Sequence, residues 1–548
     1  LVLPTLAEVG GRLRFTAEII HPNTQATVYS EYADGRGAEA VLPLVDEVNR
    51  KLRGRLGEAV DQVSEDSRAL ERVTTPNLDA LSAYTRARAL LLERNVSDAI
   101  SLLNAALSLD PEFAAASLEL AIIMNDRLES PQTLIHLEHA LRFSNRLTHR
   151  QVQHAAALRE SLTGTPRSAI DAWQMLTIEF PDFYVGWGGL AWYRWIYMND
   201  VSGAIEAVRK NIDEKNPRRS TGHYVLGALL LAQNRIPEAA EFFQSAEALG
   251  FKVENRLFSA AYAAGRDFDK AREILHRGNS SDHDIGKGSL GLAIASHLAD
   301  RGDVEHAVLA LSETRARLEN PAGVPWRFLA LAEASLMSAN ETGNRHTPSP
   351  HSATISSDEE SKKDARHTGW LESLTQSLES WATVRSSEPR EQTEDAPSQT
   401  SADISILDQT RILSRARVLR LEGKTTEAAS LLDQIVGENA VFAVRVELML
   451  AHLQAGNTEE ALREARWLRE NRGKAYSEPE ALQALVPYNA FWSTHALLIL
   501  AELTLKKGDR GQSERHLREY ESSVDIARID ARGRERLLTI KSQLQDQQ

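Results

Sequence analysis

One short pattern recurs along the chain and constrains its fold more than any other feature. An alanine is followed four residues later, in most copies, by a large apolar residue, and in several copies by a second small residue three positions further on. The pattern begins at Ala99, Ala169, Ala204, Ala239, Ala271, Ala307, Ala428 and Ala461. The steps from Ala169 to Ala307 are 35, 35, 32 and 36 residues. A period in the mid-thirties is typical of a stacked array of helical hairpins.

A second set of small residues gives this pattern a physical reason. It lies about twelve positions before many of the alanines, at Ala87, Ala157, Gly227, Ala295 and Ala416. Two antiparallel helices pack closely only where neither carries a bulky side chain at the crossing. The turns between the paired helices read TGTP (163–166), AGRD (264–267), RGD (301–303), EGK (422–424), AGN (455–457) and KGD (507–509). We expect the glycine of each turn to adopt the left-handed conformation that ends the first helix.

The most complete copies resemble the tetratricopeptide repeat (TPR). Residues 220–253 carry Leu226, Gly227, Ala239, Phe243 and Ala246 at the motif positions, and residues 80–113 match nearly as well. The resemblance implies a mostly α fold, a TPR-type α-solenoid superhelix. In such an array the first helices line a concave groove that binds peptides or proteins.

Shifts in composition divide the chain into segments. Repeats are legible over residues 76–338 and 405–522, and a capping helix is expected over 523–548. Two polar stretches, 339–368 and 385–404, are predicted to be disordered because they have almost no apolar side chains to bury. Between them, residues 369–384 place Trp370, Leu371, Leu374, Leu378 and Trp381 on one helical face. That segment either completes an interrupted repeat or is a docking helix on a tether.

The N-terminal residues 1–72 differ from the rest. Alternating apolar residues predict strands over 11–20 and 26–33, and a helix is predicted over 37–58. Two strands and a helix are too few for an independent domain, so we interpret them as a small α+β fragment. The chain opens LVLPTLAEVGG without an initiating Met, which fits either a piece cut from a longer protein or a processed mature end.

This fragment, followed by repeats, resembles the TolB-like segment that precedes TPR arrays in bacterial multidomain signalling proteins. The resemblance implies a sensory or regulatory arm, with a class III nucleotidyl cyclase or a Ser/Thr protein kinase encoded upstream. No motif of those catalytic domains occurs in this chain, so their activity is not assigned to any residue here.

Composition excludes several classes of function. The formal net charge is −14, which argues against binding a nucleic-acid backbone. The absence of cysteine excludes disulfides, thiolate metal sites and cysteine nucleophiles. No HExxH helix, G-x-S-x-G elbow or phosphate loop of Walker spacing is present. We therefore predict a non-catalytic protein with no cofactor and no metal site.

The location and assembly of the chain stay open at this level. No apolar run approaches the ~20 residues that a membrane helix needs, so we expect no direct membrane insertion. The chain suits the cytoplasm, or the periplasm if an upstream helix tethers it. Self-association is also left open.

The expected function is a protein–protein interaction scaffold, with peptide or protein partners held in the concave groove. An aromatic cluster in DFYVGWGGLAWYRWIYMND (182–200) and equivalent positions of neighbouring repeats supply the groove candidates. These are Tyr84, Arg88, His154, Trp192, Trp195, Tyr224 and Arg256. Aromatic and arginine side chains are the anchors that peptide recognition favours. The alternative interpretation is that these aromatics pack between repeats.

Overall fold

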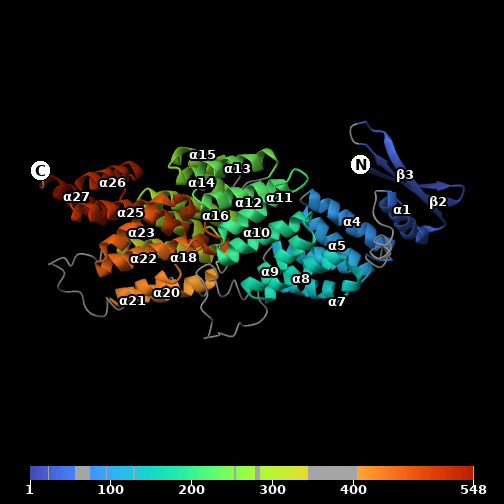
Figure 1. Ribbon diagram of the computed structural model, residues 1–548, viewed down its shortest axis with the longest axis horizontal. Coiled ribbons are helices and arrows are strands. Elements are labelled where there is room, and N and C mark those ends of the chain that lie inside the picture. Colours follow the sequence, from blue (N-terminus) through green and yellow to red (C-terminus); the bar gives the residue numbers. More distant parts are fainter. Residues whose placement is uncertain are drawn as a thin grey trace. The chain divides into compact units, whose positions relative to one another are not determined.

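The computed structural model describes residues 1–21, 24–55, 74–93, 95–126, 130–251, 255–277, 284–321, 323–342 and 404–546 (Figure 1). These form two compact units, one within residues 1–164 and one within residues 165–342 and 404–546. The predicted helix at 369–384 and nearly all of the stretches 339–368 and 385–404 lie outside the described residues.

The N-terminal unit begins with a three-stranded antiparallel sheet of order β1-β2-β3. The strands are β1 (Val2–Val9), β2 (Arg12–Ile20) and β3 (Thr27–Gly35), followed by the short 3-10 helix η1 (Ala38–Ala40) and by α1 (Val41–Arg55). Helix α1 packs against β2 and β3. The buried residues of this layer are Ala17, Ala33, Leu44, Val48 and Leu52.

The prediction of only two strands was wrong, because β1 is a third. Gly10 and Gly11 have φ angles of 60° and 74° and join Val9 to Arg12. Positive φ at both positions of a two-residue loop is the conformation that tight hairpins prefer. Pro4 made the segment a poor strand candidate, but an edge position tolerates proline. Strand β1 pairs only with β2 among the described strands.

The same unit continues with five helices. They are α4 (Leu78–Leu92), α5 (Val96–Leu109), α6 (Ala114–Asp126), α7 (Ser130–Arg142) and α8 (His149–Thr163), with the 3-10 turn η2 (Ser144–Arg146) before α8. Helix α4 packs against α5, and α6 packs against α7. The pattern residues Ala87, Ala99, Leu103 and Ala106 are fully buried, as the sequence predicts.

The larger unit begins with ten helices that follow the predicted repeats. They are α9 (Pro166–Glu179), α10 (Tyr184–Met198), α11 (Val201–Asn211), α12 (Arg219–Ala232), α13 (Ile236–Ala248), α14 (Asn255–Ala264), α15 (Phe268–Arg277), α16 (Asp284–Asp300), α17 (Val304–Ala316) and α18 (Val324–Thr342). The close approach expected at Gly227 is present. A Cβ atom there would lie 2.9 Å from the Phe243 ring and 3.2 Å from the Ala239 carbonyl oxygen.

The C-terminal part of this unit holds the remaining helices. They are α20 (Ile406–Leu421), α21 (Thr425–Asp433), α22 (Phe442–Ala455), α23 (Thr458–Glu470), α24 (Arg472–Tyr476), η4 (Glu480–Leu485), α25 (Val486–Lys506), α26 (Arg510–Ser523) and α27 (Ala531–Asp546). Helices α20, α22 and α25 pair with α21, α23 and α26, respectively. The mostly α fold class with a small N-terminal sheet is confirmed.

Helix α25 lies in the interior of the larger unit. It packs against α16, α18, α23 and α26, and nearly all of its residues are buried. The segment Leu482–Lys506 is long and apolar enough to cross a membrane by length and composition alone, which the sequence analysis overlooked. Its most apolar stretch of 18 residues is entirely buried in the protein, as expected for a core helix.

In this unit, other helices cover the first helix of each hairpin. Helix α10 contacts α20, helices α12 and α14 contact α24, and α16 and α18 contact α25. In α12 every residue from Leu226 to Ala232 is buried, and α14 is buried along almost its whole length. The C-terminal helices therefore cover surface that a simple stack of hairpins would leave exposed.

Candidate functional site

The C-terminal helices dock on the turns of four consecutive hairpins. Each turn places one residue in the left-handed region: Asn199, Asn234, Arg266 and Gly302. The Asn199 side chain donates to the Asn439 carbonyl at 3.0 Å, and the Gly473 amide donates to the Asn234 side chain at 2.8 Å. A Cβ atom on Gly473 would lie 2.3 Å from the Leu231 carbonyl oxygen. The two parts of the unit therefore meet in close backbone contact.

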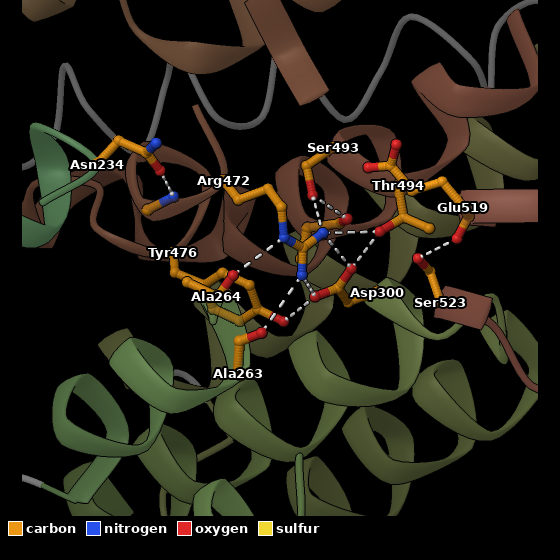
Figure 2. Close-up of polar contacts among 12 residues, drawn as sticks. Asn234, Ala263, Ala264, Asp300, Arg472, Tyr476, Ser493, Thr494, Glu519 and Ser523 are labelled. Carbon is orange, nitrogen blue, oxygen red and sulfur yellow. Dashed lines mark hydrogen bonds and ion pairs between the residues drawn. The ribbon is translucent and has the colours of Figure 1, made fainter. Parts of the chain in front are cut away.

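Arg472 forms the centre of this contact (Figure 2). Its Nη1 and Nη2 atoms donate to the two carboxylate oxygens of Asp300 at 2.9 and 2.6 Å. Its Nε donates at 3.1 Å to the Ala264 carbonyl, at the end of α14. The Nη1 atom also donates to the Thr494 hydroxyl at 2.8 Å. The guanidinium thus joins two first helices, α14 and α16, to α24 and α25.

The carboxylate of Asp300 is fully buried and fully satisfied. It also accepts hydrogen bonds from the Tyr476 hydroxyl at 2.7 Å and from the Thr494 hydroxyl. Burial alone would raise the pKa of Asp300, but the charge and hydrogen bonds of Arg472 outweigh it and lower that pKa. The pair is therefore ionised in the folded protein.

Arg266 lies beside this network, but its guanidinium lacks the hydrogen bonds that Arg472 makes. It follows α14 in the left-handed conformation, with φ of 66°. Its Nη1 and Nη2 atoms are shielded from solvent and have no hydrogen-bond partner among the described residues. Burial and the charge of Arg472 lower the pKa of its guanidinium, and Asp300 and Glu519 only partly offset them.

The prediction that glycine supplies the left-handed residue is confirmed in four turns, at Gly302, Gly423, Gly456 and Gly508. It is wrong at 264–267, where Arg266 rather than Gly265 has positive φ. It is also wrong at Gly164, whose φ is −88°. A non-glycine residue in this region costs roughly 1–2 kcal/mol, and asparagine tolerates it better than other residues.

Two cavities lie beside α15, and Arg266 lines the first of them. One, of about 260 Å³, is lined by Arg266, Asp267, Phe268, Asp269, Arg301, Ser522, Ser523 and Val524. The other, of about 270 Å³, lies between α15 and α16 and is lined by Phe268, Arg272, Leu275, His276, Leu290, Ile294, His297, Leu298 and Arg301. Phe268 and Arg301 line both cavities, and the Arg301 guanidinium lies 5.7 Å from the centre of the Phe268 ring. We call the two cavities together the Arg301 site.

Three predicted groove residues lie in the N-terminal unit. Tyr84 is buried and packs against Phe113, with ring centres 5.0 Å apart. Arg88 is exposed and forms an ion pair with Glu119 at 3.6 Å. His154 is 7% exposed, and burial lowers its pKa to about 4, so the imidazole is neutral at physiological pH. Of the three, Arg88 offers the most accessible side chain.

The other four predicted residues lie in the larger unit. Trp195 is 5% exposed, and its ring meets that of Trp192 edge-on at 6.1 Å. Trp192 is partly exposed. Tyr224 packs against Phe243 and Phe251, and Arg256 is buried. The aromatic contacts of Trp195 and Tyr224 lie within single repeats, so a ligand role for these residues and their packing between repeats both stay predictions.

The sequence alone does not identify Arg266, Arg301, Asp300 or Arg472 as functional residues. A readable signal existed for one of them. The turn AGRD places Gly265 six residues before the pattern alanine Ala271, whereas Gly302, Gly423 and Gly456 each precede their alanine by five. Within the described residues no cluster of three or more His, Asp or Glu side chains could hold a metal ion.

A family model described as "Tetratricopeptide repeat" matches residues 84–126 and 196–250. These residues belong to helices α4–α6 and α10–α13, so TPR repeats are present in both units. No curated protein matches the chain in sequence.

Similar solved structures include the crystal structure of the P58(IPK) TPR domain, at 14% identity and a TM-score of 0.20, covering 73% of this chain and 99% of that one. The structure of Naa15/Naa10 bound to HypK-THB is 13% identical with a TM-score of 0.20, covering 93% and 78%. The human IFIT1 dimer with m7Gppp-AAAA is 12% identical with a TM-score of 0.25, covering 87% and 94%. At these values the likeness carries no functional argument.

Proposed function

We propose that this chain is a non-catalytic scaffold that binds protein or peptide partners. The observation that carries the proposal is the presence of TPR repeats in both units. Stacked helical hairpins present extended surfaces suited to partner binding rather than a single enclosed pocket. Partner-binding surface is available at partly exposed residues such as Arg88 and Trp192.

We also propose a finer setting, in which the chain is the sensory or regulatory arm of a bacterial signalling protein. Support comes from the resemblance of residues 1–72 to a TolB-like segment. The alternative is that the chain is the C-terminal part of a class III nucleotidyl cyclase or of a Ser/Thr protein kinase. The coding sequence upstream of Leu1 distinguishes these possibilities, since each catalytic domain carries its own motifs.

Affinity capture tests the scaffold proposal. The full chain is immobilised, incubated with a lysate, and its bound proteins are identified by mass spectrometry. We expect partners that bind in near-stoichiometric amounts and that are lost with the Gly227→Leu variant. That substitution forces α12 away from Phe243 and disrupts a TPR hairpin. The matched control is Arg277→Ala, which alters only an exposed ion pair with Glu273.

If no protein is retained above the level seen with heat-denatured chain, the scaffold proposal is wrong. Titration of any captured partner against Trp192→Ala and Arg88→Ala variants then tests the groove candidates separately. Unchanged affinity in both variants would remove those two residues from the binding surface.

A further inference from the structure

We propose that the Arg301 site binds a segment of a partner protein in which a large apolar side chain lies next to a carboxylate. The proposal rests on the scaffold function and names the chemistry of one of its binding sites. It is argued from the walls of the two cavities, from the state of Arg266 and from charge complementarity.

The cavity between α15 and α16 is suited to an apolar side chain. Its walls include the Phe268 ring and four aliphatic side chains: Leu275, Leu290, Ile294 and Leu298. Its volume of about 270 Å³ accommodates a tryptophan or leucine side chain. Ile294 is 38% exposed, so part of this apolar surface is accessible to a ligand.

The adjoining cavity is suited to an anion. Arg301 makes no hydrogen bond or ion pair through its side chain among the described residues, apart from its position over the Phe268 ring. The two acidic side chains in this wall are already engaged within α15. Asp267 accepts from the Lys270 amide at 3.0 Å, and Asp269 pairs with Arg272 at 3.1 Å. The guanidinium of Arg301 therefore remains available to a carboxylate.

Arg266 adds a second positive charge that the fold itself leaves uncompensated. Its Nη atoms have no partner in the described part of the chain, and its neighbour Arg472 already uses Asp300. Leaving a charged donor buried and unpaired is unfavourable. A ligand carboxylate held at Arg301, in the cavity that both arginines line, would bring a negative charge close to Arg266 and offset part of this cost.

The backbone gives an independent reason to assign a role to Arg266. Every other left-handed residue of the hairpin turns of this unit, within the described residues, is Asn or Gly. These are the residue types that adopt the conformation at least cost. An arginine at this position lowers stability twice, through its left-handed backbone and through its buried, unpaired guanidinium. Such a loss of stability is expected where a residue serves binding.

Charge complementarity selects the ligand. Arg266 and Arg301 line the first cavity together with Asp267 and Asp269, whose carboxylates are engaged by the Lys270 amide and by Arg272. Arg301 also lines the apolar second cavity, so its guanidinium faces both. A neutral apolar peptide would fill the apolar cavity but leave the Arg301 guanidinium without a carboxylate. An acidic residue next to a bulky apolar one satisfies both cavities at once.

The test uses the full chain and a fluorescein-labelled peptide of sequence GSWEESG, followed by fluorescence anisotropy. We expect saturable binding that weakens by roughly tenfold to a hundredfold in Arg301→Ala and in Arg266→Gly. Peptides GSWQQSG and GSAEESG should each bind more weakly, because one lacks the carboxylates and the other the apolar anchor. Arg277→Ala, at the end of α15 and outside both cavities, should bind like the unmodified chain.

Arg266→Gly separates binding from folding. Glycine fits the left-handed backbone, so this variant should unfold at the same temperature or higher while losing affinity. Equal affinity in Arg266→Gly and the unmodified chain, or no saturable binding of GSWEESG up to about 1 mM, overturns the proposal. Neither result affects the capture experiment, which detects partners bound anywhere on the chain.

Discussion

Arg472 and Arg266 are neighbours in electrostatic contact with the same carboxylate, yet their surroundings differ completely. Arg472 donates to Asp300, Thr494, Ser493 and two helix-end carbonyls. Arg266 has two buried nitrogens without a partner among the described residues. A buried charge whose hydrogen bonds are all made holds helices together; we call the contact of Arg472 with Asp300, Thr494 and the end of α14 the joint. A buried charge without hydrogen-bond partners marks a place where a ligand could supply them.

We expect the largest loss of stability when Arg472, the arginine with all its hydrogen bonds made, is replaced. Replacing Arg472 with methionine leaves the fully buried Asp300 without its ion-pair partner. Removal of one partner of a buried pair costs about 3–5 kcal/mol. We expect the free energy of unfolding of Arg472→Met to fall by that amount in urea titrations followed by circular dichroism.

A double variant shows whether the loss comes from the orphaned charge. Arg472→Met combined with Asp300→Leu removes both charges and keeps apolar volume at the joint. We expect it to recover most of the lost stability, since a buried ion pair often contributes little over well-packed apolar residues. A double variant as unstable as the single one would show that helix docking depends on the hydrogen bonds themselves.

Glu478 is an intermediate case, a buried carboxylate with only one of its two oxygens hydrogen-bonded within the described residues. Its Oε1 accepts from the Phe442 amide and the Asn489 side chain, while its buried Oε2 has no partner in the described chain. Burial raises the pKa of Glu478 to about 7, above its usual value of 4.5. The folded state therefore binds the proton more tightly than the unfolded state does.

It follows that Glu478 lowers stability progressively as pH rises from about 4.5 to about 7. Glutamine keeps the Oε1 contacts and removes the charge. We expect Glu478→Gln to match the unmodified chain near pH 4.5 and to exceed it by about 1–3 kcal/mol at pH 8. Measuring the difference between the two proteins cancels the buried histidines, which titrate over the same range. A pH-independent difference would contradict the assignment.

The hairpins could be predicted from sequence because their main requirement is local. Two helices of one hairpin meet at small residues about twelve positions apart, so Gly227 and Ala239 indicate their own contact. The same reasoning failed for β1, where Pro4 concealed an edge strand.

The contacts of Arg472 and Gly473 with the earlier hairpins could not be predicted, because they join residues that are far apart in sequence and belong to no repeating pattern. Arg472 and Asp300 are separated by 172 positions, and Gly473 and Asn234 by 239. Nothing local distinguishes Asp300 from the many carboxylates on exposed helix faces. Only the turn at 264–267 differs visibly in sequence, because Gly265 lies six residues before the pattern alanine Ala271 instead of the five seen in the other glycine turns.

The smallest expected change in the free energy of unfolding is at the left-handed turn positions. We expect glycine to raise stability at Arg266 and to lower it at the equivalent position Asn234. Arg266→Gly removes a left-handed arginine and an unpaired buried charge, so we expect a gain of about 1 kcal/mol in the free energy of unfolding. Asn234→Gly relaxes the same backbone conformation but loses the bond from the Gly473 amide, at a cost of about 1 kcal/mol. Thermal unfolding of the two variants in parallel gives both values.

Opposite signs would show that the four turns are not equivalent, although they share one backbone conformation. In that case Asn234 stabilises the docking of the C-terminal helices, whereas Arg266 lowers the stability of the fold and serves ligand binding in the neighbouring cavity. A loss of stability in Arg266→Gly as large as in Asn234→Gly would mean that Arg266 belongs to the joint. In that case the distinction between satisfied and unsatisfied arginines would not hold in solution.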